Sequence, residues 1–241
     1  KYGHRDHRGG GRSSARETAC RVVAGVLAGL VIPDVVVKAW TSAVGPVELK
    51  TNWQHLDLSA VDSHPTRCPE ASVADEMASY IAHVRDEKDS TGGVISAVAT
   101  GLAVGWGEPV FDKLQADLAK ALMGINAVKG FEIGSGFAAA EMLGSQHNDE
   151  IGANFETKTN NAGGIVGGLS NGAPLELRVA FKPVATIGKE QNTVNSDGKS
   201  VSLTAKGRHD PCVVPRAVPI VEAMIKLVLA DQYLRNLKYT R

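Results

Sequence analysis

Four stretches of the chain space their apolar residues at the period of an α-helix, and they cover residues 14–30, 72–88, 111–124 and about 219–237. The first stretch begins with Ser14 and Glu17, which have the spacing of a capping box. Its apolar stripe consists of Cys20, Val23, Val26, Leu27 and Leu30. We predict that all four helices turn such a face toward a hydrophobic core.

The other three predicted helices differ in how they begin and in how apolar they are. Ser72 is the expected N-cap of the second helix, with Asp75 at the third helical position. The apolar positions are Met77, Ile81 and Val84 in the second helix, and Phe111, Leu114, Leu118 and Leu122 in the third. The last helix is expected to begin near Pro219, because proline is tolerated in a first turn. It is apolar nearly all round, which predicts burial on most sides.

Strands and turns are predicted between these helices. Residues 92–104 and 175–183 have the composition of strands, and Pro183 is expected to end the second one. The sequence Asp197-Gly198 lies between polar flanks and indicates a hairpin turn. Since the chain shows no internal repeat and no clear linker, we predict one α+β domain over residues 1–241. Its long helices are expected to pack against antiparallel sheet.

Composition and charge narrow the class of protein. The 241 residues are 43% hydrophobic and 22% charged, as in an ordinary soluble globular protein. No apolar run reaches the roughly eighteen residues of a membrane span, and no signal-peptide pattern follows Lys1. The net charge is zero, but it is +4 over residues 1–21, +5 over residues 199–241 and −9 between them. A neutral total argues against a nucleic-acid-binding protein. Two basic ends that meet would form an anion site, and simple solvation of each end is the alternative.

The cysteines and histidines form no disulfide or metal pattern. Cys20, Cys68 and Cys212 are far apart and odd in number, which excludes a disulfide scaffold or zinc ribbon and indicates a reducing cytoplasm. The sequence HDPC at residues 209–212 has metal-binding residue types, but no second ligand cluster supports it. We therefore expect no bound metal.

The strongest local signal for a binding site is GGGRSSARET at residues 9–18. Consecutive glycines let backbone N–H groups approach an anion, and the helix behind them directs its positive end at the same place. Arg12 and Arg16 add charge, while Ser13 and Ser14 add hydroxyl donors. The segment indicates a phosphate or carboxylate site without the G-K-[ST] of a Walker A loop. A capped helix after a flexible arm is the alternative.

Three weaker signals leave their alternatives open. Arg208, His209 and Asp210 are types that bind phosphate and move protons, but a charged surface turn fits as well. The GSGFAA sequence at residues 134–139 fits a dinucleotide fold, yet no regular βαβ alternation surrounds it, which favours close backbone packing. The segment Lys182–Thr186 fits either a phosphate contact or a plain strand end.

A family resemblance rests on five segments, KYGHRDHRGGGRSSARET (1–18), GEPVFDKL (107–114), INAVKGFEIGSGF (125–137), NNAGGIVGGLSNG (160–172) and GRHDPCVVPRAVPIVEAM (207–224). Through them the chain resembles the chorismate synthase family along its whole length and in the same order. The resemblance implies a homotetramer and a β-α-β sandwich, with long helices packed between antiparallel sheets. It also implies a lyase of the shikimate pathway, which makes chorismate by 1,4-elimination of phosphate from 5-enolpyruvylshikimate-3-phosphate.

Reduced FMN is the cofactor that the resemblance implies, although the reaction has no net redox change. Two sources of the reduced flavin are possible. The protein reduces its own FMN with NADP(H), or it receives FMN that is already reduced. The residues that match the family's FMN positions are Arg12, Ser13, Ser14, Asn126, Ala127, Gly167, Lys182, Pro183, Val184, Ala185, Thr186 and Arg208. Those that match its substrate positions are Ser14, Arg16, Arg208 and Asp210. Asp210 is the implied catalytic residue, beside flavin N5, where it assists proton handling.

Two departures from the family pattern affect what we expect of this chain. Val184 and Ala185 stand where the family often has Thr and Ser, which leaves backbone contacts there. The family also has a segment before KYG, with two histidines that protonate the flavin and the leaving phosphate, and His4 and His7 do not match them. We therefore expect an N-terminally truncated chain that folds but lacks turnover by itself. The alternatives to a lyase function are a non-catalytic fragment that keeps fold and assembly contacts, and an NAD(P)-dependent oxidoreductase built on the glycines at 134–136.

Overall fold

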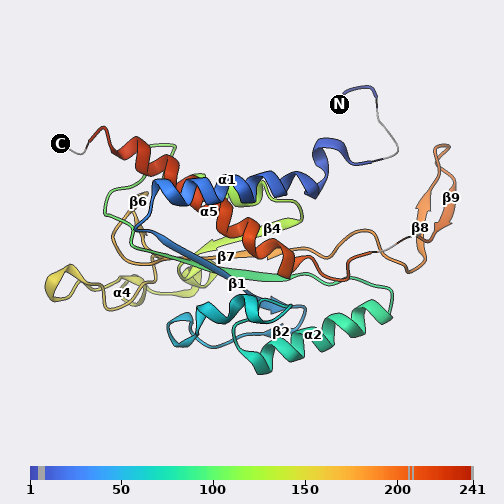
Figure 1. Ribbon diagram of the computed structural model, residues 1–241, viewed down its shortest axis with the longest axis horizontal. Coiled ribbons are helices and arrows are strands. Elements are labelled where there is room, and N and C mark those ends of the chain that lie inside the picture. The colour runs from blue at the N-terminus through green and yellow to red at the C-terminus, as the bar shows by residue number, and fades with distance from the viewer. Residues whose placement is uncertain (5–8, 206, 208, 240–241) are drawn as a thin grey trace. The chain divides into compact units, whose positions relative to one another are not determined.

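The computed structural model describes residues 1–4, 9–205, 207 and 209–239, without the side chains of residues 12 and 154 (Figure 1). Its helices are α1 (Thr18–Val31), α2 (Ala71–Asp86), α3 (Leu114–Met123), α4 (Gly144–His147) and α5 (Val214–Asn236). Its strands are β1 (Val36–Val44), β2 (Val47–Glu48), β3 (Gly93–Thr100), β4 (Val128–Ile133), β5 (Ile165–Val166), β6 (Leu169–Ser170), β7 (Leu175–Phe181), β8 (Gln191–Val194) and β9 (Ser200–Leu203). Short 3-10 helices are η1 (Gly11–Ser13), η2 (Ala15–Glu17), η3 (Trp53–His55), η4 (Leu58–Ser63), η5 (Gly136–Glu141) and η6 (Ala153–Phe155).

The strands form a five-stranded sheet of order β2-β1-β3-β7-β4 and two hairpins, β5-β6 and β8-β9. The pairs β1–β2, β5–β6 and β8–β9 are antiparallel. This mixture of helices and antiparallel strands is the predicted α+β class. The chain divides into two compact units. The first contains Lys1–Lys38, Ala97–Arg178 and Pro219–Arg241, and the second contains Ala39–Ser96 and Val179–Val218. The single-domain assignment stays a prediction.

The core of the first unit contains helix α3 and one face of α5. Leu114, Leu118 and Leu122 of α3 are fully buried, as their spacing predicted, whereas Phe111 lies before the helix and is 88% exposed. In the part of α5 that belongs to this unit, Val221, Ile225 and Leu229 are fully buried, and none of residues 219–230 is exposed. The predicted burial of the last helix on most sides is therefore confirmed.

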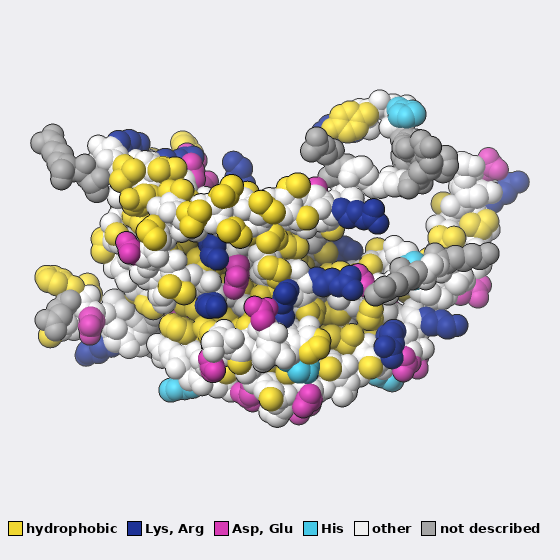
Figure 2. All heavy atoms as spheres, viewed as in Figure 1, with side chains coloured by type: hydrophobic (Ala, Val, Ile, Leu, Met, Phe, Trp, Pro, Cys, Tyr) yellow, Lys and Arg dark blue, Asp and Glu magenta, His cyan; other side chains and the backbone are white. Residues whose placement is uncertain are grey.

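The apolar stripe of α1 points away from the core, contrary to the prediction. Val23, Val26, Leu27 and Leu30 are each more than 60% exposed, and Cys20 is exposed too. Hydrophobic side chains gather along this helix in Figure 2. The buried residues are the small ones, Thr18, Gly25 and Ala28. A Cβ atom on Gly25 would lie 2.4 Å from the Cβ of Ala223 in α5. The close approach of the two helices therefore decides which face is buried.

Replacing Gly25 by alanine is expected to destabilise the protein by about 1–3 kcal/mol, because the new methyl group overlaps α5. Gly29→Ala is the matched control on the same helix, since its Cβ would meet only Lys226 Cδ at 3.8 Å. That substitution is expected to be neutral or to stabilise by about 0.4–1 kcal/mol. Urea unfolding of both variants measures the difference, and equal unfolding midpoints would contradict the close approach.

The ends of α1 and α5 differ from the prediction in ways that local chemistry explains. Ser14 caps the short helix η2 by accepting a hydrogen bond from the Arg16 amide at 3.4 Å, and α1 begins only at Thr18. Glu17 pairs with Arg21 at 2.6 Å instead of closing a capping box. Helix α5 begins at Val214, five residues before the predicted Pro219. Pro219 therefore lies inside the helix, where it leaves the carbonyl of residue 215 without its helical N–H donor.

The core of the second unit forms around β1, β3 and α2. Ala39, Ile95 and Met77 are completely or almost completely buried there. Helix α2 confirms the stretch predicted over 72–88, but it begins one residue earlier, after Glu70, and Ser72 provides no cap. The hairpin β8-β9 confirms the turn predicted at residues 197–198. Gly198 has a φ of 75° and its N–H donates to Asn195 O at 3.0 Å.

Within the described part of the chain, no helix is both long and apolar enough to cross a membrane.

Candidate functional site

The predicted binding residues fall into two groups, one in each compact unit. The first group consists of Ser13, Ser14, Arg16, Asn126, Ala127 and Gly167, and the second consists of Lys182–Thr186 and Asp210. Arg208 and His7 lie outside the described residues, and Arg12 is described only by its backbone.

The glycine-rich segment at residues 9–14 forms a turn in front of α1. The Ser13 amide and hydroxyl both donate to Gly10 O, at 3.0 and 2.5 Å, and the Ser14 amide donates to Gly11 O at 3.1 Å. A Cβ atom on Gly9 or Gly11 would meet nothing within 4 Å. The backbone is therefore not covered by other groups at these two glycines, and the anion site stays a prediction. Arg16 is exposed in the same segment.

A hydrogen bond across 113 residues brings two of the predicted flavin positions together. Asn126 Nδ2 donates to Ser13 O at 3.0 Å. Arg21 supports the same contact, since its Nη1 donates to Gly124 O at 3.2 Å while its other nitrogens bind Glu17. Sequence reasoning missed Arg21, and its four-residue spacing from Glu17 was the only signal that pointed to it.

Ala127 and Gly167 share a left-handed backbone. Their φ angles are 70° and 64°. Gly167 lies in the turn of the β5-β6 hairpin beside Gly168. A Cβ on Gly168 would lie 2.6 Å from Lys113 Cγ, whereas a Cβ on Gly167 would meet nothing within 4 Å. Gly167 thus faces open space, although no hydrogen bond among the described residues joins it to Ser13 or Asn126.

In the second unit, the segment Lys182–Thr186 follows β7 and lies along the loop at residues 88–92. Ser90 Oγ donates to Val184 O at 2.6 Å. A Cβ atom on Gly92 would lie 2.2 Å from Phe181 O, so the two backbones are in close contact. Lys182 Nζ donates to Pro183 O at 3.1 Å. The Val184 carbonyl thus already has a hydrogen-bond partner within the unit, and the flavin contact expected at this residue stays a prediction.

The same loop also holds the segment that carries Asp210. The Thr91 amide donates to Pro211 O at 2.8 Å. Asp89 pairs with Lys189 at 2.9 Å. The Lys189 ammonium and the Ser90 amide lower the pKa of the Asp89 carboxyl by hydrogen bonding, and the pair raises the pKa of Lys189. Loop 88–92 therefore holds two predicted segments, a role that sequence reasoning missed although the adjacent Gly92 and Gly93 were visible.

Asp210 is held by an arginine that the sequence did not single out. Arg216 Nη1 lies 2.5 Å from Asp210 Oδ2, and Asp210 Oδ1 has no hydrogen-bond partner among the described residues. Two residues further on, burial raises the pKa of the Cys212 thiol, so this group remains protonated. No group of three or more His, Cys, Asp or Glu that suits a metal occurs within the described ranges.

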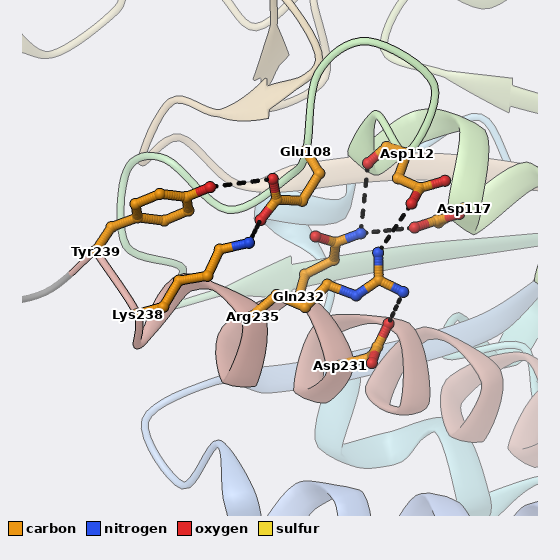
Figure 3. Close-up of polar contacts among 8 residues, drawn as sticks. All are labelled: Glu108, Asp112, Asp117, Asp231, Gln232, Arg235, Lys238 and Tyr239. Carbon is orange, nitrogen blue, oxygen red and sulfur yellow. Dashed lines mark hydrogen bonds and ion pairs between the residues drawn. The ribbon is translucent and has the colours of Figure 1, made fainter.

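The GEPVFDKL segment at residues 107–114 is a loop fastened to the end of α5 (Figure 3). Arg235 bridges Asp112 and Asp231 at 3.1 and 2.9 Å, and the Asp231 charge is the main reason why its pKa is raised. Lys238 pairs with Glu108 at 3.0 Å, and this contact raises the pKa of the lysine. Gln232, which is 1% exposed, donates to Asp117 at 2.6 Å. These contacts give the segment a structural role.

The glycines at residues 134–136 serve backbone packing rather than a dinucleotide. Gly134 has a φ of 52°, and a Cβ atom there would lie 2.1 Å from Asn161 O. The six-residue 3-10 helix η5 follows, whereas a dinucleotide fold places the N-terminus of an α-helix after its glycines. The packing alternative stated from the sequence is therefore the one that fits.

Comparison with known proteins identifies the family. A family model for "Chorismate synthase" matches residues 1–234. Chorismate synthases of Christiangramia forsetii and Cytophaga hutchinsonii each share 55% sequence identity with this chain. The aligned region covers 98% of this chain and 67% of each relative. A solved structure titled "Crystal Structure of Chorismate Synthase" has a TM-score of 0.78 at 30% identity, over 93% of this chain and 65% of that one.

These matches extend over nearly all of the residues and define an α+β chain of a lyase family. The chain belongs to the chorismate synthase family. It spans about two thirds of the length of the relatives that it matches.

Proposed function

We propose that this protein acts in the 1,4-elimination of phosphate from 5-enolpyruvylshikimate-3-phosphate to chorismate, with reduced FMN as cofactor. The observation that carries the proposal is the match to the family over residues 1–234, with relatives at 55% identity. We further propose that the protein is a cytoplasmic homotetramer.

The first group of residues fits a flavin phosphate and ring. Gly9, Gly11 and Gly167 leave open space where a side chain would stand. The hydroxyl groups of Ser13 and Ser14 lie next to the open glycines, and Asn126 ties the Ser13 backbone in place. In the second unit, Lys182 adds a half-buried cation directly after β7. When bound, reduced FMN supplies electron density to the substrate during loss of phosphate.

The substrate is a trianion, and the residues proposed for it supply cations and a proton acceptor. Arg16 and Arg208 are the proposed cations, and Arg208 lies outside the described residues. The reaction breaks the C3–O bond to phosphate and the C6–H bond, and it forms a second ring double bond. Asp210 Oδ1 has no hydrogen-bond partner among the described residues, and we propose that it accepts a hydrogen bond or a proton at the reacting centre.

A second candidate function, assembly without turnover, is favoured by one observation. The exposed stripe of α1 presents Val23, Val26, Leu27 and Leu30 to the surface, and such a patch usually marks a contact with other protein. Mixing the protein with FMN and substrate separates the two candidates. A change in the flavin spectrum that requires substrate supports the lyase, whereas no FMN binding together with a stable oligomer supports assembly alone. A spectral change that requires only NADPH would support the oxidoreductase.

Asn126→Ala is expected to weaken FMN binding about 2- to 10-fold, because it removes the hydrogen bond that orients Ser13. A neutral hydrogen bond contributes about 0.5–1.5 kcal/mol, which corresponds to that range. Quenching of FMN fluorescence measures the affinity. Asn192→Ala, at an exposed position of β8, is the control and leaves the affinity unchanged. Equal affinities for both variants would remove Asn126 from the flavin site.

A further inference from the structure

Asp210 and Arg216 form an ion pair that orients the Asp210 carboxylate. Arg216 Nη1 lies 2.5 Å from Asp210 Oδ2, and the two side chains are 64% and 33% exposed. Exposed pairs contribute little to stability, so folding energy alone does not account for this one. The guanidinium occupies one carboxylate oxygen and leaves the other, Oδ1, without a hydrogen-bond partner among the described residues. This arrangement fixes the direction of the carboxylate.

A second arginine holds the helix turn from which Arg216 projects. Pro219 has no N–H, so the carbonyl of Pro215 lacks the donor that an α-helix normally provides. Arg67 Nη1 donates to this carbonyl at 2.9 Å, and its Nε binds Asp62 at 3.0 Å. The backbone of Arg67 is itself anchored, since its carbonyl accepts from the Thr41 amide at 2.9 Å.

The other end of the segment is anchored as well. The carbonyl of Pro211, next to Asp210, accepts from the Thr91 amide at 2.8 Å. The Arg216 amide closes the turn by donating to Val213 O at 3.1 Å. Asp210 and Arg216 are therefore the two ends of one bend, and each end is fixed by a contact from outside the bend.

We propose that Arg216 is a positioning residue for Asp210, and that Arg67 holds Arg216 in place through Pro215. The inference rests on the proposed function, in which Asp210 acts beside a cofactor and a substrate that are both anionic. A bare carboxylate at that place would repel both ligands. The Arg216 guanidinium neutralises this charge from the far side and orients Oδ1 toward the ligands. Arg67 and Arg216 are not among the FMN and substrate positions that the family resemblance implies.

A pocket of about 620 Å³ gives solvent access to the Arg216 side of the pair. It is lined by residues 62–65, Arg67, Pro215 and Arg216. Removal of the Arg216 side chain therefore leaves room for a guanidinium ion from solution. This makes chemical rescue possible, a response that a loss of structure alone does not show.

The test compares Arg216→Gln with Arg85→Gln, which breaks the pair of Arg85 and Asp86 at 3.0 Å, and the two arginines are similarly exposed. The kinetic measurements use the chain fused to the segment that the family has before KYG, since the 241 residues by themselves are expected to lack turnover. In that protein, Arg216→Gln is expected to lower kcat about 10- to 100-fold through misplacement of Asp210. It is also expected to weaken FMN binding, measured by fluorescence quenching, while Arg85→Gln changes neither. In an Asp210→Asn background, Arg216→Gln should cause no further loss in either quantity. Millimolar guanidinium should partly restore kcat to Arg216→Ala but not to Asp210→Asn.

Three outcomes decide between the possibilities. Arg216→Gln could lower kcat and FMN affinity as much in the Asp210→Asn background as in the wild-type background. That result would mean that Arg216 binds a ligand directly, and it would overturn the positioning role. A side-chain NMR signal of Arg216 that does not shift on Asp210→Asn would show that the pair is not formed, and it also overturns the inference. If the unmodified protein neither binds FMN nor responds to substrate, the proposed function fails, while the NMR measurement still reports on the pair.

Discussion

Asp210→Asn is expected to slow phosphate release by about 100- to 10,000-fold, while the affinity for FMN changes little. The amide keeps the size and shape of the carboxylate but loses its charge and its basic oxygen. General acid–base groups typically contribute a factor of that size to the rate. Because Oδ2 is occupied by Arg216, the effect arises at Oδ1, the oxygen without a hydrogen-bond partner in the described part of the chain.

Single-turnover phosphate release measures this effect, with FMN that has been reduced beforehand and under anaerobic conditions. The protein assayed is the chain fused to the segment that the family has before KYG, because the 241 residues by themselves are expected to lack turnover. The measurement bypasses any step that supplies the reducing equivalents, so it reports on the elimination itself. Asp86→Asn is the control, since Asp86 is also an exposed aspartate paired with an arginine at 3.0 Å. A wild-type rate for Asp210→Asn would remove this residue from the reaction, and an equal loss in the control would indicate a general effect of charge.

Much of the fold followed from local patterns. The spacing of Leu114, Leu118 and Leu122 predicted the buried face of α3, and the Asp197-Gly198 turn predicted the β8-β9 hairpin. The faces and ends of helices followed less well, because they depend on distant partners. A stripe of large apolar residues normally faces the core, but in α1 the small face at Gly25 packs against Ala223. Only the position of α5 decides between the two faces.

In the candidate site, too, local features could be predicted from the sequence, whereas contacts with distant residues could not. The glycines and serines at residues 9–14 were visible in the sequence, because flexible backbone and hydroxyl groups before a helix have a direct physical meaning. The contacts that orient them come from Asn126 and Arg21, and the only sequence signal for Arg21 was its four-residue spacing from Glu17. Arg67 and Arg216 were equally hidden. Their roles depend on the carbonyl that Pro219 leaves without a donor and on the bend that follows Asp210.

Two glycines with nearly the same backbone conformation are expected to respond very differently to alanine. Gly134 and Gly167 have φ angles of 52° and 64°, so each alanine variant bears a similar cost of about 1–2 kcal/mol for the left-handed backbone. Gly134→Ala also forces a methyl group to 2.1 Å from Asn161 O and 2.6 Å from Gly163 N. These are backbone atoms that cannot rotate away, so a further loss of about 1–3 kcal/mol is expected from overpacking.

Gly167→Ala serves as the internal control for that loss, because its methyl group would meet nothing within 4 Å. Urea unfolding should therefore give a clearly lower midpoint for Gly134→Ala than for Gly167→Ala. FMN affinity should show the opposite order. Gly167→Ala should bind FMN more weakly than Gly134→Ala, since the methyl group on residue 167 enters space that the proposed function assigns to FMN. Folded Gly167→Ala protein with normal FMN affinity would take this turn out of the flavin site. Equal unfolding midpoints would contradict the packing of Gly134 against the segment at residues 161–163.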